Sequence, residues 1–205
     1  MKANKKALAL VLCALMLVAG SVFGTLAYLT DTATVTNTFT VGDVEITLDE
    51  QKVDLYGKPD GDTRVLENKY KLIPGHNYTK DPIVHVAEES ENCYVFVRIT
   101  NAIAEIEADE DKIADQMAEN GWVSVDGVSG VYYYGTSDEA TAVVAKTDLH
   151  VFEEFTIDGA EDAETLKNYT DTTIVVKAYA IQADGLAAND VAAIWTALKS
   201  EHADA

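Results

Sequence analysis

Alternation of apolar and polar residues with a period of two recurs along most of the chain, which places successive side chains on opposite faces of a strand. Eight segments show this alternation or are rich in β-branched and aromatic residues, and Gly, Pro and Asp residues typical of turns separate them. The predicted strands are residues 35–40, 44–48, 83–86, 93–101, 131–134, 142–146, 150–157 and 172–182. This pattern predicts an all-β protein, a jelly-roll-like antiparallel β-sandwich.

Helical periodicity is confined to a few short segments. Residues 109–120 place Ile113, Ala114 and Met117 on one face and stop at Gly121. Residues 161–168 could form a short acidic helix. Near the end of the sequence a stripe with helical spacing follows Asn189 and Asp190, and it consists of Val191, Ile194, Trp195 and Leu198. We therefore expect two or three short helices that flank the sheets.

The first 27 residues have the pattern of a secretory signal peptide. Three lysines precede an apolar run over residues 7–23, which is a little too short to span a bilayer comfortably. Small residues at Thr25 and Ala27 favour cleavage between Ala27 and Tyr28. The sequence predicts a secreted protein that contacts the membrane only before processing. The alternative is an uncleaved membrane anchor.

The processed chain would be strongly acidic. Residues 1–27 hold three lysines and no acidic residue, so cleavage leaves 178 of the 205 residues, with 12 basic and 35 acidic side chains. Such a surface repels nucleic acid and anionic lipid, which excludes nucleic-acid binding. Apolar residues make up 48% of the chain, enough for a hydrophobic core. We expect one domain over residues 28–205.

Cys93 is the only cysteine that would remain after cleavage, so the processed chain can form no intrachain disulfide. Cys93 shares one face of its predicted strand with Val95, Val97 and Ile99, which predicts a thiol in the core. The functional alternative is a disulfide between molecules.

The sequence offers no motif for catalysis. A zinc protease needs His and carboxylate ligands in a fixed pattern, and no His-Glu-x-x-His is present; the nearest segment, His85 to Glu89, lacks the second histidine. No Gly-x-Ser-x-Gly sequence marks a nucleophile. We expect no catalytic residue, no metal ligand and no cofactor. Ca²⁺ is the one cation that the acidic surface leaves open, and the oxygen-rich loop 54–62 lacks the final Glu of an EF-hand.

Four stretches, taken in order, resemble one known family. They are Gly24-Thr-Leu-Ala-Tyr-Leu-Thr-Asp31 followed by Asn37-Thr-Phe-Thr-Val-Gly-Asp-Val-Glu-Ile46, then Leu72-Ile-Pro-Gly-His-Asn-Tyr-Thr-Lys-Asp-Pro82, Cys93-Tyr-Val-Phe-Val-Arg-Ile99, and Thr173-Ile-Val-Val-Lys-Ala-Tyr-Ala-Ile-Gln-Ala-Asp-Gly185 with Trp195 beyond it. Together they resemble the TasA and camelysin (CalY) family of secreted proteins with SipW-type signal peptides. The resemblance spans nearly the whole chain.

The resemblance implies a structural protein of the cell surface or biofilm matrix. Its partners would be a dedicated signal peptidase during export, other copies of itself in a head-to-tail fibre, and other matrix proteins. The new N-terminal segment, residues 28–40 with Leu29, Val35 and Phe39, would insert as a donor strand into the next subunit. Pairing of this segment within its own subunit is the alternative that the sequence leaves open.

Two other functions stay open at this stage. Camelysin's association with peptidase activity implies a surface metalloprotease as the enzymatic alternative. A monomeric adhesin or ligand-binding sandwich is the third possibility, with the three tyrosines at 132–134 as its best candidate platform.

Overall fold

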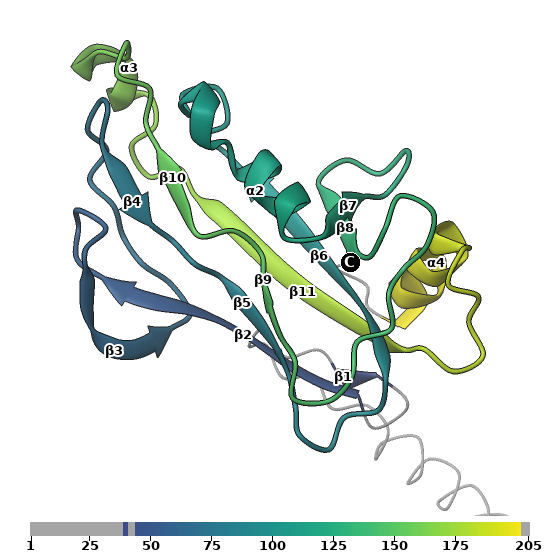
Figure 1. The fold of residues 1–205 in the computed structure, drawn as a ribbon. Coiled ribbons are helices and arrows are strands. Elements are labelled where there is room, and N and C mark those ends of the chain that lie inside the picture. Colours follow the sequence, from purple (N-terminus) through teal and green to yellow (C-terminus); the bar gives the residue numbers. More distant parts are fainter. Residues whose placement is uncertain (1–38, 41–43, 202–205) are drawn as a thin grey trace, which may run out of the picture. The chain divides into compact units, whose positions relative to one another are not determined.

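The computed structural model of the chain describes residues 39–40 and 44–201, which belong to a compact unit beginning at Thr36 (Figure 1). The predicted signal peptide, its cleavage site at Ala27 and Tyr28, and the donor-strand residues Leu29 and Val35 lie outside the described residues.

The first sheet is built around strand β2 (Val44–Val53). This strand pairs antiparallel with β1 (Phe39–Thr40), β3 (Pro59–Val65) and β5 (Ile83–Val86), and β5 pairs in turn with β9 (Asp148–His150). Val44, Ile46 and Leu48 are buried while the residues between them are more exposed, so one face of β2 lies on the core. This is the alternation of a sheet with one solvated face.

The second sheet has the strand order β11 (Ile174–Gln182), β6 (Cys93–Asn101), β8 (Val131–Tyr134) and β7 (Trp122–Ser124), all antiparallel. The first five residues of β6 are buried without alternation. The reason is that both faces of this strand are covered: one faces the first sheet, and the helix α4 (Val191–Glu201) packs on the other.

The remaining elements complete one end of the sandwich. Strands β4 (Asn77–Thr79) and β10 (Glu154–Thr156) form a separate antiparallel pair. A 3₁₀ turn η1 (Asp109–Asp111) leads into the helix α2 (Ile113–Glu119), and a short helix α3 (Ala163–Lys167) precedes β11 (Figure 1). The described residues therefore form an antiparallel β-sandwich with three short helices, which confirms the predicted fold class.

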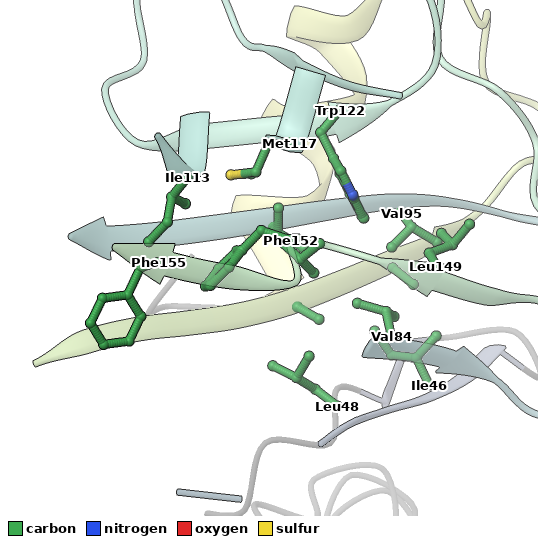
Figure 2. Packing of buried hydrophobic residues seen from close by; sticks show 14 of the residues in the cluster. Ile46, Leu48, Val84, Val95, Ile113, Met117, Trp122, Leu149, Phe152 and Phe155 are labelled. Atoms are coloured by element: carbon green, nitrogen blue, oxygen red, sulfur yellow. The ribbon is translucent and has the colours of Figure 1, made fainter. Parts of the chain in front are cut away.

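The core between the sheets receives side chains from both sheets and from α2. In Figure 2, Ile113 and Met117 of α2 point toward Phe152, and Leu48, Ile46 and Val84 approach from the opposite side. Phe152 is fully buried in the connection between β9 and β10. Burial of this kind is the main favourable contribution to folding, and Cys93, the one cysteine among the described residues, is free.

A second cluster lies between the outer face of the second sheet and α4. Trp195 of α4 is 2% exposed and stacks on Phe96 of β6, with ring centroids 5.5 Å apart. The guanidinium of Arg98 lies 5.8 Å from the Trp195 ring. The predicted stripe of Val191, Ile194, Trp195 and Leu198 is therefore a packing face, and Ile194, Trp195 and Leu198 are buried in it.

Two of the strand predictions are wrong in whole or in part. Residues 142–146 form only a single bridge, in which Val143 exchanges both backbone hydrogen bonds with Cys93 at 2.8 and 3.0 Å, and the chain then turns at Lys146, whose φ is +61°. Residues 150–157 do not form one strand. The side-chain oxygen of Gln116 in α2 accepts the N–H groups of Glu153 and Glu154 at 3.0 and 3.2 Å, which diverts the chain from β9 to β10.

A network of charged side chains connects four strands, β2, β3, β5 and β9, on the solvated face of the first sheet. The two ring nitrogens of His85 lie 2.6 Å from a carboxylate oxygen of Asp148 and 3.1 Å from one of Asp49. Arg64 in turn pairs with Asp49 at 2.7 Å and with Asp81 at 2.6 Å. A neutral imidazole has one N–H, so only the protonated ring can donate to both carboxylates.

This geometry predicts a loss of stability at alkaline pH. Burial of the His85 ring opposes its charge, but the hydrogen bonds to Asp148 and Asp49 prevail and raise its pKa above the ordinary 6.5. The stabilisation is complete below 6.5 and is lost as the pH rises through the raised value. His85→Gln should therefore lower the free energy of unfolding more at pH 6 than at pH 9, as measured by urea denaturation. An equal loss at both pH values would contradict this account.

Candidate functional site

A groove of about 940 Å³ lies along one side of the sandwich. One wall is the start of β11 with the turn before it, residues 169–175. The other wall is the connection between β3 and β4, residues 67–74. Side chains from β2, α3 and β10 close its base, among them Glu50, Leu166 and Phe155.

The β11 wall presents backbone groups that pair with no described strand. The Ala102 N–H donates to the Thr173 carbonyl, and the Ala183 N–H donates to the Asn92 carbonyl. The odd-numbered residues of β11 therefore direct their backbone N–H and C=O groups toward β6. Alternate residues of an antiparallel strand direct their N–H and C=O groups to opposite edges. Ile174 and Val176 therefore direct theirs away from β6, where no described strand pairs with them.

The opposite wall has the same property. Asn68, Tyr70 and Leu72 are half-buried while the lysines between them are exposed, the alternation of an extended segment. Among residues 68–72, Lys71 is the one that makes a backbone-to-backbone hydrogen bond within the described structure: its N–H donates to the Leu55 carbonyl at 2.8 Å. Because alternate residues of an extended segment direct their backbone groups to opposite edges, those of Tyr70 and Leu72 point away from Leu55.

Two aromatic rings that line the groove, Tyr70 and Phe155, pack with Tyr78. The Tyr70 ring meets Tyr78 and Phe155 edge-on, with centroids 5.7 and 5.2 Å away, and Tyr78 stacks on Phe155 at 4.8 Å. The Tyr70 hydroxyl donates to the Thr79 carbonyl at 3.0 Å. Burial, together with the negative charges of Glu50 and Asp81, raises the pKa of Tyr70 well above its usual range, so this ring stays neutral.

One ion pair is buried in this apolar setting. The Lys80 ammonium donates to a carboxylate oxygen of Glu50, and the other Glu50 oxygen accepts from the Asn68 side-chain amide at 2.9 Å. The side chains of Lys80 and Glu50 are only 9% and 6% exposed. A buried ion pair is often less stabilising than well-packed apolar residues of similar volume, so its presence at the base of a groove suggests a role in recognition.

Apolar side chains project into solvent around the groove. Five large apolar residues are strongly exposed in the described part of the chain, and two of them line this groove: Leu55 at 54% and Val175 at 41%. Isolated exposed apolar residues are common, but a cluster beside a recess marks an interaction site.

The residues that the sequence singled out are distributed as follows. Of the predicted donor-strand residues, Phe39 alone is described, and its strand β1 pairs with Glu45 and Val44 of its own chain. Cys93 is buried as predicted, and burial raises its pKa to about 11, which makes its thiol a poor nucleophile.

In the acidic segment 54–62, the carboxylates of Asp54 and Asp60 bind to neighbouring groups of the same chain. The Asp54 carboxylate accepts the N–H groups of Tyr56 and Lys58 at 2.8 and 3.0 Å, and Asp60 pairs with Lys52 at 2.6 Å. Pro59–Val65 forms β3 rather than a loop. Within residues 39–40 and 44–201, no three His, Cys, Asp or Glu side chains come together as a metal site would require.

The groove was not predicted from the sequence. Its walls come from residues 67–74 and 169–175, which are joined only by tertiary packing, and the first of these segments has no strand pattern strong enough to be noticed. The available signal was the alternation of Asn68, Tyr70 and Leu72 with charged residues before the Pro74-Gly75 turn.

None of the helices among the described residues has the length and apolar character needed to cross a membrane. No protein-family model, no curated protein and no solved structure matches the chain.

Proposed function

We propose that this chain is a secreted structural protein of the cell surface or extracellular matrix, and that it polymerises by strand addition. In this proposal the N-terminal segment of one processed subunit enters the groove beside β11 of the next. The order of sequence stretches that resembles the TasA and camelysin family supports the same function.

The observation that carries the proposal is a pair of backbone edges beside the groove where certain residues have no partner among the described strands. Ile174 on one wall, with Val176 two residues further along β11, and Tyr70 and Leu72 on the other wall direct backbone groups to edges where no described backbone group meets them. Main-chain hydrogen bonds to such edges are the source of affinity when a peptide adds to a sheet. Tyr70, Phe155 and the exposed Leu55 and Val175 supply apolar contacts for its side chains.

The occupant that we assign is residues 28–35 of a second copy. This segment precedes the compact unit that begins at Thr36 and would start at the signal cleavage site. Leu29 and Val35 lie among three threonines whose β-branching favours an extended chain. Fully extended, eight residues span about 26 Å.

Insertion into a neighbour would produce a filament. The segment and the groove are different surfaces, so each subunit both donates and accepts, and repetition of such a contact continues without closing unless the rotation happens to close. Before cleavage the same segment is continuous with the apolar run of residues 7–23. Removal of residues 1–27 would then act as the switch for assembly.

The test is negative-stain electron microscopy of the purified chain beginning at Tyr28. We expect filaments, which persist in the presence of a chelator, and no cleavage of casein. Chelator-sensitive casein cleavage without filaments would favour the metalloprotease. Uniform monomers without proteolysis would contradict the proposal and favour a monomeric surface-binding protein.

A further inference from the structure

Lys80 has hydrogen-bonding capacity that the described structure does not use. An ammonium group carries three N–H donors, and within the described residues the Lys80 ammonium makes a single hydrogen bond, to Glu50. The side chain is 9% exposed and lines the groove. Both carboxylate oxygens of Glu50 already accept a bond, from Lys80 and from Asn68.

When a strand fills the groove, the unused N–H donors of Lys80 affect the free energy of binding. In an open groove, water can accept from them. A strand that enters the groove expels that water, and a buried charged donor without an acceptor costs free energy. The occupant therefore has to present an oxygen near Lys80, and a negatively charged oxygen would be the stronger acceptor.

The assigned occupant holds one residue suited to this role. Among residues 28–35, Asp31 is the only acidic side chain, and in an added strand it would share one face with Leu29 and Ala33. The opposite face carries Thr30, Thr32 and Thr34 in succession and specifies the register weakly, because a shift by two residues replaces one threonine by another. A single charged contact would remove that ambiguity.

We propose that Lys80 fixes the register of the entering strand by binding the Asp31 carboxylate of the neighbouring subunit. The Lys80 ammonium would then donate to two carboxylates, Glu50 of its own chain and Asp31 of the neighbour. This inference rests on the proposed function. A single buried polar contact that selects one register at some cost in stability has a precedent in coiled coils, where one polar core residue does the same.

The test is a double-mutant cycle on the chain beginning at Tyr28, with the critical concentration for filament formation measured by pelleting. One change is Asp31→Leu. The other replaces the ion pair by neutral side chains of similar size, Glu50→Gln with Lys80→Met, because removal of Lys80 alone would leave a buried charge. Each should raise the critical concentration at least about tenfold. Combined, they should return it to within about threefold of the starting value, because an apolar residue then faces an apolar base.

Two controls keep the outcome interpretable. Asp184→Leu makes the same chemical change at an exposed turn and should leave the critical concentration unchanged. Asp31 lies outside the compact unit that begins at Thr36, so its replacement does not endanger the fold, and circular dichroism checks the double change in the groove. The proposal is overturned if Asp31→Leu has no effect or if the effects of the two changes simply add. Absence of filaments from the unmodified chain would instead refute the proposed function itself.

Discussion

A chain that begins at Thr36 should form no filaments under conditions in which the chain beginning at Tyr28 forms them. The deletion removes residues 28–35, the proposed donor strand, and keeps the whole compact unit. The groove would remain open but would have no strand to receive, so the expected product is a folded monomer. Sedimentation velocity and electron microscopy measure this directly.

A synthetic peptide of residues 28–35 provides the matched control for the truncated chain. It should bind with a stoichiometry of one and block the groove without restoring filaments, and a peptide of the same composition in scrambled order should not bind. Filaments formed by the truncated chain would show that assembly uses another surface.

Val176→Pro should abolish filament formation from the acceptor side and leave the subunit folded. Val176 directs its N–H away from β6, so proline there removes a donor of the open edge and no hydrogen bond of the β6–β11 ladder. The proline ring also obstructs the approach of an added strand. We expect soluble monomers with a cooperative thermal transition and no pelletable material.

The control for this change is Val144→Pro. Val144 is an exposed valine, 56% accessible, which does not line the groove. Its replacement should leave filament formation intact. Normal filaments from Val176→Pro, in a protein whose fold is preserved, would exclude the β11 edge as the acceptor.

Much of the sandwich could be predicted because its central strands alternate strongly. Cys93–Asn101 and Ile83–Val86 were predicted with the bounds that the structure shows, and 44–48 lies within β2. Strand β3 was missed because its residues are mostly exposed, so no apolar periodicity marks it, and pairing with β2 alone makes it a strand. Residues 150–157 have the composition of a strand, and the bonds from Gln116 that divide them come from a helix more than 30 residues away.

The groove depends on contacts that composition cannot reveal. The sequence indicates that Tyr70 and Ile174 are apolar positions, but only the fold places their segments on opposite walls of one recess. The partnership of Glu50 with Lys80 is equally hidden, since 30 residues separate them and neither stands in a recognisable motif. By contrast, residues 28–40 attract attention in the sequence alone, because a threonine-rich segment follows the apolar run without a spacer.

The most direct test of strand exchange between subunits is to mix the two assembly-defective variants. The chain beginning at Thr36 keeps the groove and lacks the strand, whereas the Val176→Pro chain beginning at Tyr28 keeps the strand and lacks a competent groove. Light scattering after size-exclusion chromatography should show monomers of each alone and a one-to-one heterodimer in the mixture. If the mixture contains only monomers while the unmodified chain forms filaments, the N-terminal strand and the groove beside β11 are not the contact that builds them.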